Sequence, residues 1–182
     1  MQKMRWKRSD MRKVFRKMRA DFYVQLNKKI RGKSRLVRVI VLSDKILTAV
    51  CFILYPVYEI YLSLTDRYLL VKTLSVPAVS FVVISLLRMF INAKRPSEIC
   101  GLKPILSQTR CDRSFPSRHV FSAFAVAVAF AQSDIRLGII FCFIGTMIAV
   151  LRVAGGVHFV RDVVVGAFAG LTSCALYPMF PF

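Results

Sequence analysis

The chain has 182 residues, a hydrophobic fraction of 56% and a formal net charge of +19, so it is both apolar and strongly basic. A soluble domain is about 45–50% apolar, so this composition argues against a soluble globular protein and favours a single membrane-embedded domain. The charge is unevenly placed, since 16 of the 28 Lys and Arg residues precede residue 46. We therefore divide the chain into a basic segment, residues 1–45, and a membrane-embedded domain, residues 46–182.

The basic segment predicts an amphipathic helix. From Asp10 to Ile30 apolar residues recur every three or four positions, which is the period of one helix face, and the other face carries Arg and Lys. Such a helix would lie in the interface of an anionic leaflet. The alternatives are a solvated tail and a leader that docks on the helical bundle. Nucleic-acid binding is disfavoured, because no recognised module or aromatic platform accompanies the charge.

Five apolar runs follow, and each is near the roughly 17–25 residues that cross a bilayer. The candidate spans are residues 46–64, 69–92, 118–133, 136–152 and 159–180. Only three residues separate the third span from the fourth, and both are short, which predicts a tight helical hairpin. The expected fold is therefore all-α, an integral-membrane helical bundle with about five spans plus an N-terminal amphipathic interfacial helix.

The five cysteines form no CxxC pair and no Cys/His cluster with the spacing of a zinc site. Cys51, Cys142 and Cys174 lie in apolar runs and are predicted to be buried apolar side chains. Cys100 and Cys111 flank one polar loop, and they would be able to pair if that loop is extracytoplasmic.

Three groups of polar residues lie at the ends of spans, where ionisable side chains are costly and usually functional. They are residues 88–96 (RMFINAKRP), residues 116–119 (PSRH) and residues 151–162 (LRVAGGVHFVRD). The second span ends at the first group, the third span begins at the second group, and the fourth span leads into the third group. All three groups are therefore predicted to meet at one end of the bundle.

The residue types in these groups suit phosphoryl transfer. Planar guanidinium groups match phosphate oxygens, and the groups contain Arg88, Arg95, Arg118 and Arg152. Ser117 is placed to cap the third membrane helix, whose first N–H groups would then form an anion site. Each residue alone has a simpler explanation, such as an arginine that reaches the headgroups or a serine that only caps a helix.

The chain has only two histidines, and both lie in these groups. His158 and Asp162 are four residues apart, so on a helix the carboxylate would accept the imidazole N–H and make the other nitrogen a better nucleophile. His119 is then available to protonate the leaving oxygen. Together these residues predict phosphoryl transfer through a phosphohistidine.

At these residues the sequence resembles the type-2 phosphatidic acid phosphatase superfamily, which includes lipid phosphate phosphatases and is related to vanadium haloperoxidases. The family pattern is K-x6-R-P, then P-S-G-H, then S-R-x5-H-x3-D. The matching positions are Arg88 with Arg95-Pro96, then Pro116 to His119, then Arg152, His158 and Asp162. The resemblance covers residues from about 46 to 180.

The resemblance implies a role for each matching residue. The phosphate would be held by Arg88, Arg95, Ser117 and Arg152, together with the backbone N–H of residue 118. His119 would be the general acid, His158 the nucleophile and Asp162 the carboxylate that orients it, with no metal required. The sequence departs from the pattern in having Arg88 for lysine, Arg118 for glycine and Leu151 for serine. Arg118 puts a bulky cation beside the phosphate site.

We therefore expect a metal-independent phosphatase acting on a membrane lipid phosphate, such as phosphatidic acid, phosphatidylglycerol phosphate or a polyprenyl (pyro)phosphate. The alternative is a catalytically silent membrane protein that binds anionic lipid headgroups. A transporter or channel is disfavoured, because the polar residues lie at one mouth and not along a path.

The positive-inside rule places residues 1–45 in the cytoplasm, and the five predicted spans that follow cross the cell membrane. Counting spans from there returns all three polar groups to the cytoplasmic face. Members of the superfamily commonly have six spans and an extracytoplasmic site, and a disulfide between Cys100 and Cys111 would also favour that side.

Overall fold

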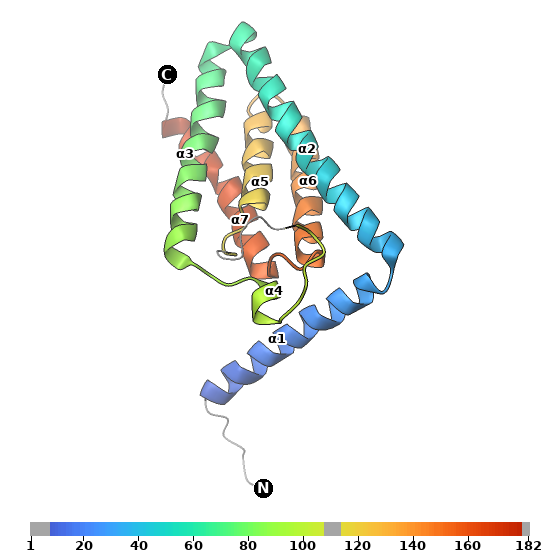
Figure 1. Ribbon diagram of the computed structural model, residues 1–182. Helices are drawn as coiled ribbons and strands as arrows, with labels where there is room; N and C mark the ends of the chain where they lie inside the picture. The colour runs from blue at the N-terminus through green and yellow to red at the C-terminus, as the bar shows by residue number, and fades with distance from the viewer. Residues whose placement is uncertain (1–7, 108–113, 180–182) are drawn as a thin grey trace.

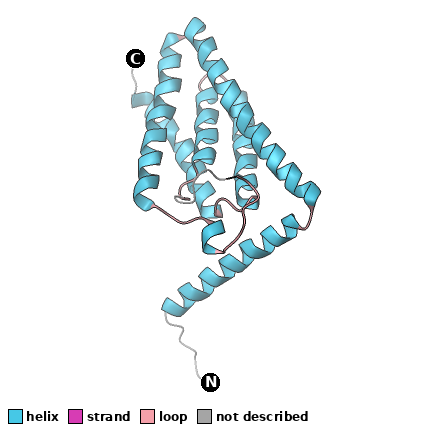
Figure 2. Ribbon diagram, in the orientation of Figure 1, coloured by secondary structure: helices cyan, strands magenta, loops and turns pink. Residues whose placement is uncertain are grey.

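The computed structural model describes residues 8–107 and 114–179, and it describes side chains from residue 20 onward. Within these residues every regular element is a helix (Figure 2). The elements are α1 (Arg8–Arg31), α2 (Ser34–Thr65), α3 (Arg67–Ile91), α4 (Pro96–Ile99), α5 (Arg118–Ala131), α6 (Ile135–Ala154), α7 (Val160–Thr172) and a 3₁₀ helix, η1 (Ser173–Met179). The predicted all-α fold is confirmed.

The five predicted spans correspond to α2, α3, α5, α6 and α7 with η1, which run along one bundle, while α1 crosses below its lower end in Figure 1. Among the described residues, three helical stretches are long and apolar enough to cross a membrane: Arg67–Ile99, Ile135–Ala154 and Val160–Met179. α5 is apolar but shorter, with 14 residues. Length and composition alone thus qualify three of the five predicted spans.

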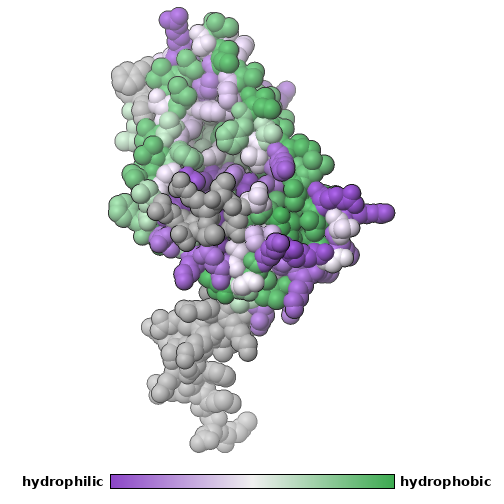
Figure 3. All heavy atoms as spheres, in the orientation of Figure 1, coloured by the Kyte–Doolittle hydropathy of each residue, from purple (hydrophilic) through white to green (hydrophobic). Residues whose placement is uncertain are grey.

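Large apolar side chains point outward from the bundle. Phe52, Phe90 and Phe168 are 73%, 84% and 68% exposed. In Figure 3 hydrophobic residues cover the body of the bundle, and hydrophilic residues gather toward its ends. An apolar surface of this extent would be unfavourable in water, whereas in a bilayer it faces the lipid tails. The chain is therefore a membrane protein.

α5 is the central helix, and it is apolar on all sides. Every residue from Ala123 to Phe130 is buried, as expected for a helix that has protein all around it. Two glycines on α7 allow that helix to approach the N-terminal end of α5 closely. A Cβ atom on Gly166 would lie 2.7 Å from the carbonyl oxygen of Ser117, and one on Gly170 would lie 2.7 Å from that of Phe121. α7 is thereby held against the start of α5.

The C-terminal half of α1 docks on the end of the bundle. Ile30 is buried and packs with Ile40, Leu106 and Val157. Arg31 Nη2 donates hydrogen bonds to the carbonyl oxygens of Lys103 and Pro104, at 2.9 and 3.1 Å. The docked-leader alternative therefore describes this half of the helix, and the side chains of residues 1–19 lie outside the described part.

The predicted boundary between residues 45 and 46 lies inside α2, which is continuous from Ser34 to Thr65. The turn that separates the basic helix from the bundle falls instead at Gly32 and Lys33. The sequence pattern missed this extension because the first two turns of α2 are too basic to read as part of a membrane span.

The cysteines follow the predictions only in part. Cys51 is buried in the core as predicted, and Cys142 is half-buried. Cys174 is exposed, so its predicted burial is wrong. It lies in η1 at the end of the chain, where an apolar residue can face lipid instead of protein. The proposed pairing of Cys100 with Cys111 involves a residue outside the described range.

Candidate active site

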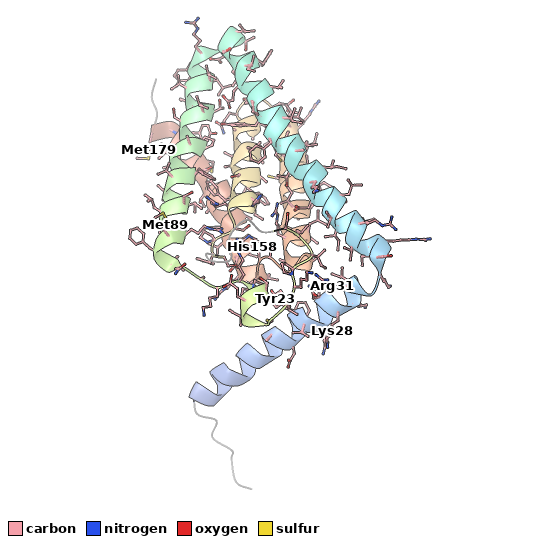
Figure 4. The ribbon with its side chains drawn as sticks, in the orientation of Figure 1. Tyr23, Lys28, Arg31, Met89, His158 and Met179 are labelled. Atoms are coloured by element: carbon pink, nitrogen blue, oxygen red, sulfur yellow. The ribbon has the colours of Figure 1, made fainter. Side chains whose placement is uncertain are left out.

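The structure brings the three polar groups together at the end of the bundle that α1 crosses, where His158 is marked in Figure 4. Arg88 Nη1 of the first group donates a hydrogen bond to the carbonyl oxygen of Pro116 in the second, at 2.9 Å. Arg95 Nη1 donates to the carbonyl oxygen of Val157 in the third group, at 3.2 Å. The N–H of Ser117 donates to the carbonyl oxygen of Asp162, at 3.0 Å. Each pair of groups is therefore joined by a direct hydrogen bond.

A tight turn after α6 places the third group. Arg152 lies in the last turn of α6, and His158 follows two glycines in the loop before α7. Gly156 has a φ of +75°, a conformation that other residues rarely adopt. A Cβ on Gly155 would lie 2.5 Å from side-chain atoms of Leu106. The double glycine is thus a structural requirement of this turn, which returns the chain toward Arg152.

His158, Asp162 and Ser114 form a buried polar set. His158 is 2% exposed, and its Nδ1 lies 3.7 Å from Asp162 Oδ2 and 3.4 Å from Ser114 Oγ. The Ser114 hydroxyl donates a hydrogen bond to the same carboxylate oxygen. The His158 nitrogen that faces this pair is Nδ1, so Nε2 is the nitrogen left for other chemistry. The predicted pairing of His158 with Asp162 is present, with Ser114 as an additional partner. The predicted shared helix face is wrong, because His158 lies in the loop before α7, and the turn of that loop brings its ring to Asp162.

Sequence reasoning missed Ser114. It stands just before the second polar group, so its position was the only signal for it. Further hydrogen bonds hold the carboxylate of Asp162 in place, since Oδ2 accepts from the N–H of Phe159 at 3.1 Å and Oδ1 accepts from Arg161 Nε at 3.2 Å. Because Asp162 is fully buried, these donors are what stabilise its charge.

The surroundings of His158 favour the neutral imidazole. Burial lowers the pKa of His158 below its ordinary value, and the positive charges of Arg95 and Arg88 act in the same direction. The nearby carboxylate of Asp162 opposes this shift. Near neutral pH the Nε2 lone pair is therefore available for attack on an electrophile.

Three of the four predicted arginines are buried around this set. Arg88, Arg95 and Arg152 are each less than one-tenth exposed. Arg152 Nε lies 3.0 Å from Asp44 Oδ1 on α2, as an ion pair in which these two atoms lack the alignment of a hydrogen bond. Asp44 is buried as well, and sequence reasoning also missed it. The only signal was an acidic residue just before the first predicted span.

Ser117 is the N-cap residue of α5, but its hydroxyl makes no capping hydrogen bond, so the predicted side-chain cap is wrong. The hydroxyl is buried and has no hydrogen-bond partner among the described residues. Its backbone is fixed from outside the helix, because its N–H is bonded to Asp162 and its carbonyl oxygen packs against Gly166. The helix start is therefore positioned by α7 and not by its own cap.

His119 and Arg118, which begin α5, have exposed side chains and line a cavity of about 580 Å³. α2 contributes Cys51, Phe52 and Tyr55 to its wall, and α3 contributes Pro77 and Phe81. A volume of this order suits a small-molecule or lipid-tail site. Of the predicted site residues, Arg118 and His119 line this cavity, whereas Arg88, Arg95, Arg152 and His158 do not.

Within residues 20–107 and 114–179, no group of three or more His, Cys, Asp or Glu side chains is arranged to hold a metal ion. A metal-independent reaction remains a prediction from the residue types. The donors gathered at this end are arginines, imidazoles and backbone N–H groups, which bind anions.

Comparison with known proteins gives the family. The PAP2 superfamily model matches residues 68–182, more than half of the chain. The chain belongs to the PAP2 superfamily and is a phosphoric ester hydrolase embedded in a membrane. No curated relative is matched in sequence.

Two solved structures have a similar fold. LpxE of Aquifex aeolicus aligns with a TM-score of 0.69 and 20% identity, covering 87% of this chain and 93% of that one. The first transmembrane PAP2 type phosphatidylglycerolphosphate phosphatase from Bacillus subtilis aligns with a TM-score of 0.59 and 18% identity, covering 91% and 95%. At these identities the likeness establishes the fold, and its coverage extends beyond the part that the family model matches.

Proposed function

We propose that the protein is a metal-independent lipid phosphate phosphatase that acts through a phosphohistidine intermediate. The observation that carries the proposal is the buried set of His158, Ser114 and Asp162 beside three buried arginines, next to an apolar cavity that His119 lines. Such a site offers a nucleophile, cations for a phosphate and room for a hydrocarbon tail.

The terminal phosphate binds among Arg88, Arg95 and Arg152, whose guanidinium groups neutralise its charge and stabilise the charge of the transition state. The hydroxyl of Ser117 and the first N–H groups of α5, including that of Arg118, add hydrogen bonds at the positive end of the helix. The ion pair with Asp44 holds the Arg152 side chain in place before the substrate arrives.

In the first step His158 Nε2 attacks phosphorus, and the bond from phosphorus to the leaving oxygen breaks. His119 gives that oxygen a proton, and Asp162 stabilises the positive charge that develops on the His158 ring. In the second step a water attacks the phosphohistidine, His119 takes up a proton from this water, and the nitrogen–phosphorus bond breaks. Inorganic phosphate leaves, and both histidines return to their starting states.

The lipid tail lies in the cavity between α2, α3 and α5, because that cavity adjoins the general acid and has a largely apolar wall. Candidate substrates are phosphatidic acid, phosphatidylglycerol phosphate and a polyprenyl (pyro)phosphate. One structural neighbour is a phosphatidylglycerolphosphate phosphatase, which is consistent with this class.

Release of phosphate from this lipid panel in the presence of EDTA tests the proposal, with wild type compared with His158→Ala. We expect release by wild type only. Equal release by the two proteins would remove the mechanism. Lipid binding that survives His158→Ala, with no turnover by either protein, would favour the alternative of a silent protein that binds anionic headgroups.

For the membrane arrangement, we propose that the N-terminus is cytoplasmic in the cell membrane and that the exposed basic residues of residues 1–45 bind an anionic lipid surface. Lys28 and Lys29 of α1 and Lys33 and Arg35 at the start of α2 are exposed, and α1 crosses the end of the bundle where the candidate active site lies (Figure 1). This placement of basic residues supports a cytoplasmic site. Labelling of single-cysteine variants at residues 100 and 135 tests the side. Labelling of residue 100 only from outside would refute it.

A further inference from the structure

Arg118 is a further arginine near the candidate active site, and the phosphate site proposed for Arg88, Arg95 and Arg152 does not use its side chain. The family pattern has glycine at this position, yet here an exposed arginine lies with its guanidinium carbon 5.8 Å from the ring centroid of Phe81 on α3. Arg152 and Arg161 have carboxylate partners in Asp44 and Asp162. Arg118 makes no ion pair with any residue in the described part of the chain. Its charge is therefore available to a ligand.

The position of Arg118 sets it apart from the three buried arginines. Arg118 and His119 line the apolar cavity, and among its described lining residues Arg118 is the one with a permanent charge. Arg88, Arg95, Arg152 and His158 do not line it. Arg118 is exposed at the edge of this apolar cavity, and its contact with the Phe81 ring leaves the N–H donors of the guanidinium for a ligand.

The geometry of phosphoryl transfer indicates which part of the substrate lies near the charge of Arg118. The attacking and leaving atoms lie roughly in line on opposite sides of phosphorus. In the proposed mechanism His119 protonates the leaving oxygen, so that oxygen lies on the side of the cavity that His119 and Arg118 line. Arg118 therefore lies on the leaving-group side, next to the atoms that link the transferred phosphate to the tail.

We propose that Arg118 is a specificity-determining residue that binds a second anionic group on the leaving-group side, so that the preferred substrate is a lipid diphosphate. This inference rests on the proposed phosphatase function and extends it to the substrate class. His158 Nε2 bonds to the terminal phosphorus, the bond from that phosphorus to the bridging oxygen breaks, and His119 protonates the bridging oxygen. A lipid monophosphate departs, and water then releases inorganic phosphate from His158.

The two substrate classes differ in what they need from Arg118. A monoester leaves as an alcohol, which is neutral once His119 has protonated it. A diphosphate leaves as a phosphate that still has negative charge after protonation and must be held in an apolar cavity. A guanidinium–phosphate contact of this kind is charge-assisted and able to form two parallel hydrogen bonds. Arg118 thus favours the diphosphate both in binding and in departure.

The test uses full-length protein in detergent with geranylgeranyl diphosphate and geranylgeranyl monophosphate, which share one tail. Initial rates of phosphate release are measured, and the lipid product is identified by mass spectrometry. We expect wild type to favour the diphosphate in kcat/KM by roughly 10- to 100-fold, the value of one charge-assisted contact. Arg118→Gln is expected to lower kcat/KM for the diphosphate by a larger factor than kcat/KM for the monophosphate, and so to remove most of this preference. Arg118→Lys is expected to keep part of it.

Lys94→Gln is the matched control, because Lys94 is an exposed cation at the same end of the bundle that does not line the cavity. It is expected to leave the preference unchanged. If Arg118→Gln does not fold, Arg118→Gly makes the same test with the residue of the family pattern. Equal loss on both lipids, or no change on either, overturns the role of Arg118 while leaving the phosphatase standing. Absence of release from both lipids by wild type overturns the proposed function and this inference together.

Discussion

Replacement of Ser114 by alanine removes one hydroxyl donor from the Asp162 carboxylate and leaves the other partners of that carboxylate in place. Burial lowers the pKa of His158, and Asp162 opposes this effect. In wild type the Ser114 hydroxyl draws part of the carboxylate charge toward itself. Without it, more of that charge faces Nδ1 and stabilises the protonated imidazole. The pKa of His158 is therefore expected to rise in Ser114→Ala.

The size of the effect follows from the remaining contacts. A hydrogen bond to a charged group contributes about 1.5–3 kcal/mol. Asp162 retains the Phe159 N–H at 3.1 Å and Arg161 Nε at 3.2 Å, so we expect a loss of stability near the lower end of that range. One pKa unit corresponds to about 1.36 kcal/mol, so the pKa of His158 is expected to rise by no more than about one unit.

The assay is the pH dependence of kcat/KM, whose acid limb reports protonation of the nucleophile in the free enzyme. We expect this limb to move to higher pH in Ser114→Ala, with a lower melting temperature in detergent. Ser173→Ala is the matched control, because it also removes a buried hydroxyl, which donates to Gly170, without contact to the histidine. An unchanged acid limb in Ser114→Ala, with folding intact, would refute the proposed coupling.

Three further changes test other contacts. Asp44→Asn leaves the buried Arg152 without its anionic partner, and loss of one partner of a buried ion pair costs about 3–5 kcal/mol. Because inorganic phosphate can replace the missing anion, it is expected to raise the melting temperature of this variant by more than that of wild type. An equal rise would contradict the role of the ion pair. Gly166→Ala puts a Cβ atom 2.7 Å from the carbonyl oxygen of Ser117, and overpacking of this kind costs about 1–3 kcal/mol, so we expect lower stability and lower activity. Gly32→Ala is the control and is expected to change neither, because its Cβ would meet nothing closer than 3.5 Å. Wild-type activity of Gly166→Ala would show that the start of α5 tolerates displacement. Tyr23→Phe removes the hydroxyl that accepts a hydrogen bond from the N–H of Val160 at 2.9 Å, at the start of α7 and two residues after His158. Faster hydrogen exchange at Val160 and a lower kcat are expected, and unchanged exchange would argue against stabilisation of the start of α7 by α1.

The sequence alone led to most of the catalytic candidates because their spacing follows the geometry of a membrane helix. The end of one span and the start of the next lie at the same face of the membrane, so the three polar groups at such positions predict one cluster. The four-residue spacing of His158 and Asp162 also predicts their contact, although the contact forms through the loop before α7 and not along a helix face. The amphipathic period of residues 10–30 likewise predicts the helix that the structure contains as α1.

Only the tertiary structure revealed the partners that come from elsewhere in the chain. Asp44 reaches Arg152 because α2 and α6 pack together, and nothing in the sequence around Asp44 indicates which arginine it meets. Tyr23 reaches Val160, the first residue of α7, because α1 folds back across the bundle. The amphipathic pattern of α1 is equally consistent with a helix on a lipid surface.

The same distinction holds for the segment with Ser117, Arg118 and His119. Its polar residues, and the arginine where the family pattern has glycine, are properties of the sequence. The surroundings of each side chain depend on the tertiary structure, because α5 packs against α7 on one side and lines the cavity on the other. Periodicity and spacing determine which residues share a face of the membrane. Which of them meet a phosphate and which meet a lipid tail depends on contacts between helices that are distant in sequence.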